Sequence, residues 1–177
     1  MEKQLIECVP NVSEGRNPKT IEAIAAEIVS VPGVALLHVD RGESANRTVF
    51  TYAGEPEAVT EASFRMIRRS LELIDMRHHH GEHPRIGAVD VFPFVPLAGI
   101  TVGETLVYAR RLAERVGREL GVPVYGYEGM ASVPGRKLLA ECRKGEYEGL
   151  RTKLSDPLWK PDFGPSEWSD RVARGGA

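Results

Sequence analysis

Short apolar runs alternate with turn-forming residues through the first half of the chain. Four of these runs are rich in apolar, β-branched or aromatic side chains, and they cover residues 5–9, 34–39, 47–53 and 86–97. This composition predicts strands. Asp40 follows the second run, so we expect it at a strand end. Pro93 and Pro96 interrupt the last run, and since proline cannot donate to a strand ladder, we expect both at a sheet edge or a bulge.

Three segments carry apolar residues at the spacing of an amphipathic helix. The first begins with Asn17-Pro18, an N-cap residue followed by proline at the first helical position, and the second opens at Pro56 and ends near Met76. The third begins with Thr101 and Glu104, whose spacing is that of a capping box, and Gly121 stops it.

The last third of the chain has weaker patterns. Residues 122–127 alternate apolar and aromatic positions and predict a fifth strand, and residues 134–144 predict a short helix that Gly145 closes. The remaining tail is rich in Pro, Trp, Asp and Gly, so we expect it to be irregular.

The element order predicts the fold class. It runs β-α-β-β-α-β, followed by an additional α-β unit and a helical turn, which fits an α+β, ferredoxin-like fold with its helices on one face of a mostly antiparallel sheet. The opposite sheet face then needs a ligand, a partner domain or water to cover it. A chain of 177 residues buries enough surface to form one domain, and we assign residues 1–177 to it.

Composition and charge narrow the class of protein. The chain is 42% hydrophobic and 27% charged, which is typical of a globular domain and excludes collagenous or largely disordered chains. The formal net charge of -2 gives no attraction to nucleic acid or anionic lipid, and no apolar run reaches the roughly 18 residues of a spanning helix. Cys8 and Cys142 are far apart in sequence, as in proteins of a reducing compartment, so we expect a cytoplasmic protein with buried, inert thiols.

Four of the five histidines lie between positions 78 and 83. Imidazole takes up and releases protons near neutral pH, so such crowding suggests acid-base chemistry. Taken singly, His78 and His79 fit solvent-exposed side chains without a role. His83 differs because Pro84 restricts its backbone, and Arg85 beside it offers a guanidinium that binds carboxylates and orients an imidazole.

A metal site at this cluster is the less favoured interpretation. The histidines follow a helix end instead of the H-E-x-x-H pattern, and neither cysteine is near them in sequence. We therefore expect no metal, although a metal-dependent hydrolase remains an alternative. Asp40 and Asn46 bracket one loop, and by themselves they fit ordinary turn residues as well as a site.

Several stretches together resemble the glutamate formimidoyltransferase family, specifically the N-terminal subdomain of its transferase unit. The matching residues span positions 7 to 166, and they are Glu7-Cys8-Val9-Pro10-Asn11, Ser13-Glu14-Gly15, Asn46-Arg47-Thr48-Val49, Leu73-Ile74-Asp75-Met76, Gly81-Glu82-His83-Pro84-Arg85, Gly87-Ala88, Asp90-Val91, Val122-Pro123-Val124-Tyr125, Gly145-Glu146-Tyr147-Glu148 and Asp162-Phe163-Gly164-Pro165-Ser166. Each stretch is weak evidence alone, but their order and joint presence make the resemblance specific.

The resemblance implies transfer of a formimidoyl group from N-formimidoyl-L-glutamate to N5 of tetrahydrofolate, with release of L-glutamate, a step of histidine degradation and folate one-carbon metabolism. It makes His83 the catalytic residue, and Gly164, Pro165 and Ser166 folate-binding residues. Asp40, Asn46 and Arg85 are further candidates for substrate binding or orientation. Tetrahydrofolate is the acceptor co-substrate, and no metal is implied.

The family's transferase unit also contains a second subdomain, which closes the folate cleft and which this chain lacks. The resemblance therefore implies that subdomain as a partner, and a homodimer as a further assembly. Two alternatives stay open: a non-catalytic folate-binding or assembly half-module that needs its partner, and formyl instead of formimidoyl transfer at the same site.

Overall fold

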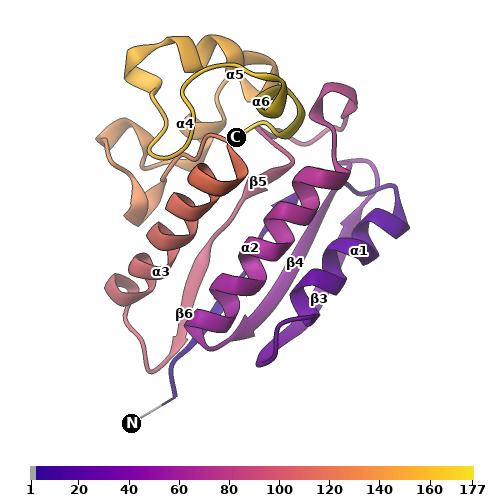
Figure 1. Cartoon of the computed structure of the whole chain (residues 1–177), viewed down its shortest axis with the longest axis vertical. Helices are drawn as coiled ribbons and strands as arrows, with labels where there is room; N and C mark the ends of the chain where they lie inside the picture. The colour runs from indigo at the N-terminus through magenta and orange to yellow at the C-terminus, as the bar shows by residue number, and fades with distance from the viewer. Residues whose placement is uncertain (1–2) are drawn as a thin grey trace.

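The computed structural model describes residues 3–177, which form an antiparallel sheet and a layer of helices (Figure 1). The strands are β1 (Leu5–Cys8), β2 (Asn11–Val12), β3 (Val34–Gly42), β4 (Arg47–Gly54), β5 (Val89–Val91) and β6 (Phe94–Ala98). Their order is β5-β2-β4-β1-β6, with β3 pairing to the free side of β4, and every pairing is antiparallel. The predicted α+β class and antiparallel sheet are confirmed.

Prolines set the limits of two predicted strands: the strand at residues 5–9 ends before Pro10, as expected, with the additional short β2 beyond it, and the strand at residues 86–97 is divided. Pro10 separates β1 from β2, and Pro93 separates β5 from β6. Since β5 and β6 stand at the ends of the strand order, Pro96 lies on an edge strand, as expected for a residue that cannot donate to a ladder. β3 extends to Gly42, so Asp40 lies within a strand and not at its end.

Three long helices lie side by side over one face of the sheet (Figure 1). They are α1 (Pro18–Val29), α2 (Pro56–Leu73) and α3 (Val102–Arg115), and a π-helical turn (Val116–Leu120) extends α3 to Gly121, whose φ of 65° ends it. The predicted starts are confirmed. The Asn17 side chain accepts from the N–H groups of Lys19 and Thr20, and the Thr101–Glu104 capping box is complete. α2 ends at Leu73, before Met76, which opens a separate 3-10 turn, η1 (Met76–His78).

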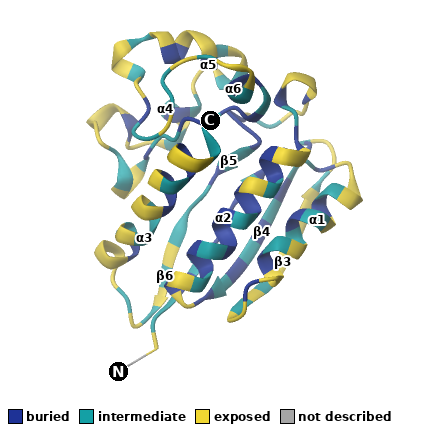
Figure 2. Ribbon diagram, viewed as in Figure 1, coloured by how far each residue is buried: buried dark blue, intermediate teal, exposed yellow. Residues whose placement is uncertain are grey.

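The core lies between the sheet and these helices. Along β4 the colours alternate between buried and half-buried (Figure 2), and β1 has the same alternation. Ile6, Phe50 and Tyr52 are fully buried and face the helices. The Tyr52 hydroxyl reaches the Ser63 hydroxyl of α2 at 2.7 Å, so this polar group does not stay unsatisfied in the core.

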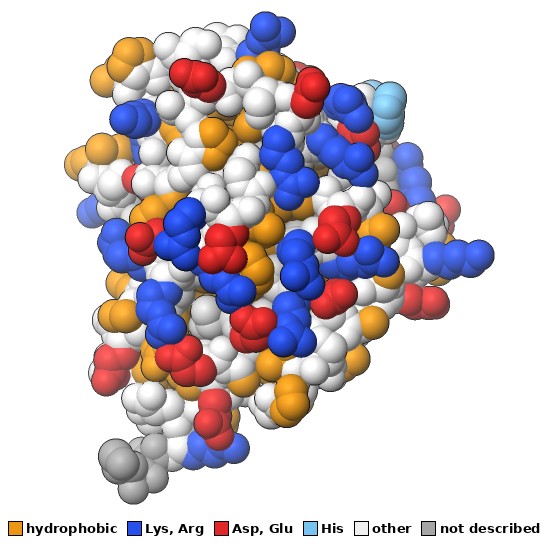
Figure 3. All heavy atoms as spheres, in the orientation of Figure 1, with side chains coloured by type: hydrophobic (Ala, Val, Ile, Leu, Met, Phe, Trp, Pro, Cys, Tyr) orange, Lys and Arg blue, Asp and Glu red, His pale blue; other side chains and the backbone are white. Residues whose placement is uncertain are grey.

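The opposite face of the sheet, which we call the open face, carries the other half of the alternation. It includes the partly exposed side chains of Glu7, Val49 and Ala53. Val95 on β6, paired with Glu7, is 38% exposed. In contrast, the outer surface of the helices is covered with charged side chains (Figure 3), among them the ion pair of Arg115 with Glu61 at 2.7 Å. Water therefore solvates the helix layer well, whereas the open face keeps apolar surface exposed.

The last third of the chain corrects the sequence predictions. The predicted strand over residues 122–127 is wrong, because within this stretch only Val124 forms a bridge, to Phe163. The predicted helix over residues 134–144 divides into η4 (Pro134–Arg136) and α4 (Leu139–Arg143). The expected irregular tail is also wrong, since it contains α5 (Glu146–Ser155), η5 (Pro157–Trp159) and α6 (Asp170–Gly175), while η3 (Glu128–Met130) precedes them.

A second small core holds this region together. It is formed by Ile86, Leu150, Leu154 and Val172. Residues 175–177 pair with the segment that precedes β5: the Ala88 N–H donates to Gly175 O at 2.7 Å, and Gly87 bridges Gly176. Among residues 3–177, no helix combines the length and the apolar character needed to cross a bilayer.

Candidate functional site

His83 lies in the loop between η1 and β5, beside the start of β4, and its ring has two defined contacts. Its Nδ1 is 2.6 Å from the carbonyl oxygen of Pro84, which only accepts, so Nδ1 carries the proton. The guanidinium of Arg47, which only donates, contacts Nε2. The two contacts therefore select the neutral tautomer with an unprotonated Nε2, and the ring is half-buried and not free in solvent.

Asn46 connects the loops around His83. Its side-chain oxygen accepts from the Gly15 N–H at 3.0 Å, and its side-chain nitrogen donates to His80 O at 2.9 Å. Its φ is 49°, a conformation that asparagine tolerates better than most residues. Because both ends of the amide already bind backbone, Asn46 orients the loops in this structure and does not point a free amide at a substrate.

His79 is a buried residue beside the site that the sequence pattern did not predict. It is buried, so the expectation of a solvent-exposed side chain is wrong for His79, whereas His78 and His80 are exposed. Its Nε2 is 2.9 Å from Asn46 O, and its Nδ1 accepts from Arg85 Nε at 3.1 Å. Burial lowers the pKa of His79, with the positive charge of Arg85 acting in the same direction, so this ring is neutral at neutral pH.

Arg85 makes no hydrogen bond to His83, and its guanidinium is fully used in other contacts inside the protein. Its Nε donates to His79, and its two terminal nitrogens donate to His79 O at 3.2 Å, to Glu146 at 3.1 Å, and to both Glu148 carboxylate oxygens at 2.7 and 2.9 Å. Hydrogen bonding to Glu148 is the main reason that the pKa of Arg85 is raised. With each of its N–H groups engaged, Arg85 connects α5 to the histidine loop.

Asp40 lies on β3, whereas His83 lies in the loop between η1 and β5. Asp40 is exposed and pairs with Val49 of β4, so the register puts its side chain on the open face. Arg47, two residues before Val49 on β4, lies on the same face. Within residues 3–177, Arg47 has no carboxylate within ion-pair distance, so Asp40 and Arg47 share a face without contact.

Gly164 lies elsewhere, in a segment packed on the π-helical end of α3. Its φ is 79°, and a Cβ added there would be 2.2 Å from Val122 O and 3.1 Å from the Gly117 Cα. Only glycine fits this approach of two backbones. Gly164, Pro165 and Ser166 are not among the residues that line the crevice at His83, so the described chain does not bring the two groups of predicted site residues into one pocket.

The crevice at His83 is small. Its volume is about 10 Å³, and its walls include Asn11, Ser13, Arg47, His79 and His83. A volume of this size is at the limit of what one water molecule occupies. A larger ligand therefore has to displace one of these side chains.

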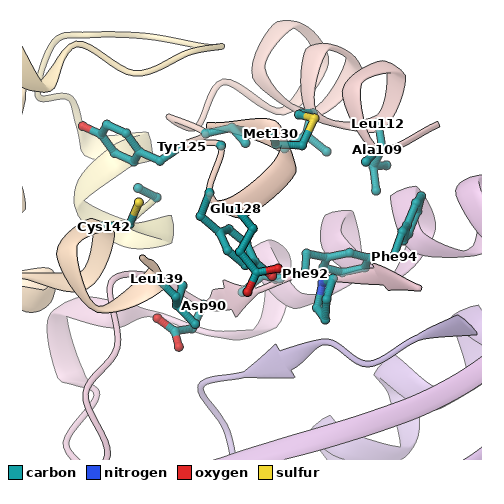
Figure 4. Close-up of a pocket in the computed structure, with 18 of the residues that line it drawn as sticks. Asp90, Phe92, Phe94, Ala109, Leu112, Tyr125, Glu128, Met130, Leu139 and Cys142 are labelled. Atoms are coloured by element: carbon teal, nitrogen blue, oxygen red, sulfur yellow. The ribbon is translucent and has the colours of Figure 1, made fainter. Parts of the chain in front are cut away.

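A separate apolar cavity of about 220 Å³ lies between α3, β5–β6 and residues 122–130 (Figure 4). Phe92, Phe94, Leu112 and Tyr125 form much of its wall, and Cys142 lies in it as well. Burial raises the pKa of the Cys142 thiol and of the buried Cys8 thiol, as expected for inert cysteines.

The four neighbouring histidines do not converge. His79 binds Asn46 and Arg85, His83 binds Arg47 and Pro84, and His78 and His80 face solvent. Across residues 3–177, no three His, Cys, Asp or Glu side chains come together as metal ligands. This arrangement gives the metal-dependent hydrolase interpretation no site in the described chain.

Comparison with known proteins adds independent information. Residues 5–175 match the family model of the formiminotransferase domain, N-terminal subdomain. The chain is 49% identical over 174 residues to a formimidoyltransferase-cyclodeaminase of Sus scrofa, which covers 96% of this chain and 32% of that protein. It is 46% identical over 161 residues to a glutamate formimidoyltransferase of Streptococcus pyogenes serotype M1, which covers 91% of this chain and 54% of that protein. The chain thus spans about a third to a half of the length of these curated relatives.

Proposed function

The chain belongs to the family of formiminotransferase N-terminal subdomains, and on this basis we propose that it supplies the acid-base group of a glutamate formimidoyltransferase. The proposed reaction moves the formimidoyl group of N-formimidoyl-L-glutamate to N5 of tetrahydrofolate and releases L-glutamate, as a step of histidine degradation. One observation carries the proposal: the His83 ring is oriented by Pro84 and Arg47 with an unprotonated Nε2, the form that accepts a proton. Relatives named glutamate formimidoyltransferase support the reaction class.

The reaction needs one group that both accepts and returns a proton. N5 of the reduced pterin attacks the formimidoyl carbon and forms a tetrahedral adduct. Nε2 of His83 takes the N5 proton and returns it to the glutamate nitrogen, so that the bond between carbon and glutamate nitrogen breaks and the amine leaves neutral. The formimidoyl group ends on N5, and His83 ends in its starting protonation state.

We assign the acceptor to a cleft between the open face and a second subdomain. The strand order, in which β1–β2 lies between β4 and β5–β6 with β3 outermost, supports a ferredoxin-like topology for residues 1–177 taken as one subdomain. Leu37 and Leu97, two strand residues that are 58% and 51% exposed, are apolar surface that such a partner would cover. Gly164, Pro165 and Ser166 are the proposed folate contacts, and Asp40 on the open face is a proposed donor contact. A homodimer remains a further proposal.

The state of the two cysteines supports a proposal for the compartment. Cys8 and Cys142 are both buried and unbridged, as in proteins of a reducing environment. We therefore propose that the reaction takes place in the cytoplasm.

Replacing the imidazole tests the assignment. In His83→Ala, assayed with the second subdomain supplied, we expect kcat to fall by about 10²- to 10⁴-fold, the usual contribution of a general acid-base group, with an unchanged unfolding midpoint. His78→Ala, which removes an exposed imidazole five residues away, is the matched control and should keep full activity. Near-normal turnover of folded His83→Ala would refute the role of His83.

A non-catalytic folate-binding half-module is the second candidate. One observation favours it: the crevice at His83 has a volume of about 10 Å³, too small for a donor. A half-module would quench the fluorescence of added tetrahydrofolate yet release no glutamate, whether or not the second subdomain is present. Release of glutamate on adding that subdomain favours the transferase.

A further inference from the structure

Arg47 is one of the half-buried arginines without an ion pair among residues 3–177; Arg171 and Arg174 are the others, and each donates to a backbone carbonyl, whereas Arg47 donates to the ring of His83. Arg85, Arg136 and Arg143 each form an ion pair with at least one carboxylate. Arg47 is half-buried, yet among residues 3–177 its guanidinium has no carboxylate partner and makes one hydrogen bond, to His83 Nε2. Most of its five N–H groups are therefore available to an anion.

The contact of Arg47 with His83 blocks the atom that catalysis needs. Nε2 has one lone pair, and a guanidinium that donates to this lone pair prevents it from accepting a proton from a substrate. The crevice has room for about one water molecule, and Arg47 forms part of its wall. Movement of Arg47 would therefore free the base and enlarge the crevice in one step.

We propose that Arg47 is the carboxylate-binding residue for the donor, and that this binding releases His83. A glutamyl donor carries carboxylates, which pair with a guanidinium in a bidentate manner more strongly than a neutral imidazole does. The donor carboxylate thus takes Arg47 away from Nε2 and leaves the base beside the amidine. The donor class is an amidine that carries a carboxylate, and an amidine without one leaves the base covered.

This inference rests on the proposed function for its substrate, but the residue can be tested without turnover. Long-range ¹H–¹⁵N spectra distinguish protonated from unprotonated ring nitrogens, and His83→Ala assigns the His83 signals. Glutarate, a dicarboxylate without an amidine, is the probe. We expect glutarate to shift the His83 Nε2 signal in the unmodified chain and in Arg68→Gln, an exposed arginine of α2, but not in Arg47→Gln.

Kinetics give a second test, with the second subdomain supplied. Arg47→Gln should raise KM for N-formimidoyl-L-glutamate by about 10- to 100-fold, the range for loss of a charged hydrogen bond, and leave KM for tetrahydrofolate unchanged. Arg47→Lys keeps the charge without the planar fork and should recover part of the loss. With formamidine as donor, which lacks a carboxylate, Arg47→Gln should be as active as the unmodified chain or more active, because Nε2 is no longer covered.

The outcomes separate the two proposals. If glutarate leaves the His83 signals unchanged, or shifts them equally in Arg47→Gln, the inference is overturned. It is also overturned if Arg47→Gln slows transfer from both donors to the same extent, as a merely structural residue would. If the unmodified protein transfers nothing from either donor while glutarate still shifts His83 through Arg47, the transferase proposal fails and the anion site remains.

Discussion

Replacement of Arg85 by methionine tests how much the hydrogen bonds of Arg85 stabilise the loop that contains His79. Arg85 connects α5 to His79, and the side chain is 8% exposed. Methionine keeps most of the apolar stem and removes every hydrogen bond of the guanidinium. The substitution leaves the Nδ1 atom and the carbonyl oxygen of His79 without donors.

The expected cost follows from which groups lose their partners in a buried place. A buried acceptor without a partner costs about 1–3 kcal/mol, and His79 contributes two. The carboxylates of Glu146 and Glu148 are 43% and 63% exposed, so water solvates them when Arg85 is absent. The loss of these two ion pairs therefore adds little to the cost in stability. We therefore expect a loss of about 3 kcal/mol in the free energy of unfolding, which in a chain of this size corresponds to a Tm lower by roughly 6–12 °C.

Urea unfolding and thermal melting measure the effect, with Glu148→Gln as the matched control. That variant keeps an acceptor for Arg85 and should cost under about 1 kcal/mol. In a His79→Leu background the cost of Arg85→Met should shrink, because one orphaned acceptor is already gone. A loss for Arg85→Met no larger than that for Glu148→Gln would show that the buried contacts with His79 contribute nothing.

Two further predictions concern pH and backbone space. Burial lowers the pKa of His79 in the folded protein. As the pH falls through about 6.5, the imidazole of His79 is therefore protonated in the unfolded chain before it is protonated in the folded one. The contribution of neutral His79 to the free energy of unfolding is complete above that pH and decreases below it. Urea midpoints at about pH 7.5 and 5.5 should show this decrease, and His79→Gln should reduce it; an equal decrease in both proteins would contradict the assignment. Gly164→Ala sets a Cβ 2.2 Å from Val122 O at a φ of 79° and should cost about 2 kcal/mol or more, whereas Gly135→Ala, with nothing within 4 Å, should change Tm little. Equal melting of the two variants would refute the steric argument.

The sequence predicts the first two thirds of the fold because local signals and tertiary packing agree there. Asn17-Pro18 and the Thr101–Glu104 capping box mark helix starts that the structure confirms. α5 was missed because Gly149 lies within it and its apolar face is narrow; Leu150 and Leu154 are its inward residues, and they pack on a second core that local sequence does not reveal. Residues 122–127 have strand-like composition, but only Val124 finds a partner.

The candidate site was predicted in part for a similar reason. Pro84 beside His83 indicated an oriented ring, and the structure gives that ring two contacts. Arg47 lies 36 residues away from His83, so no local pattern predicts their contact, and only the Asn46-Arg47-Thr48 stretch pointed to the region. Arg85 was expected to orient an imidazole, and it orients His79, because the chain turns its side chain inward.

The close contact between Gly87 and Gly176 has a practical consequence for work with this chain. Ala177 N–H donates to Ile86 O at 3.3 Å, and Ile86 lies three positions along the backbone from His83. A tag, dye or spin label attached at Ala177 would pull on the segment that carries the imidazole. Labels for single-molecule or affinity work therefore belong on the outer side of α2, where their tether leaves this segment undisturbed.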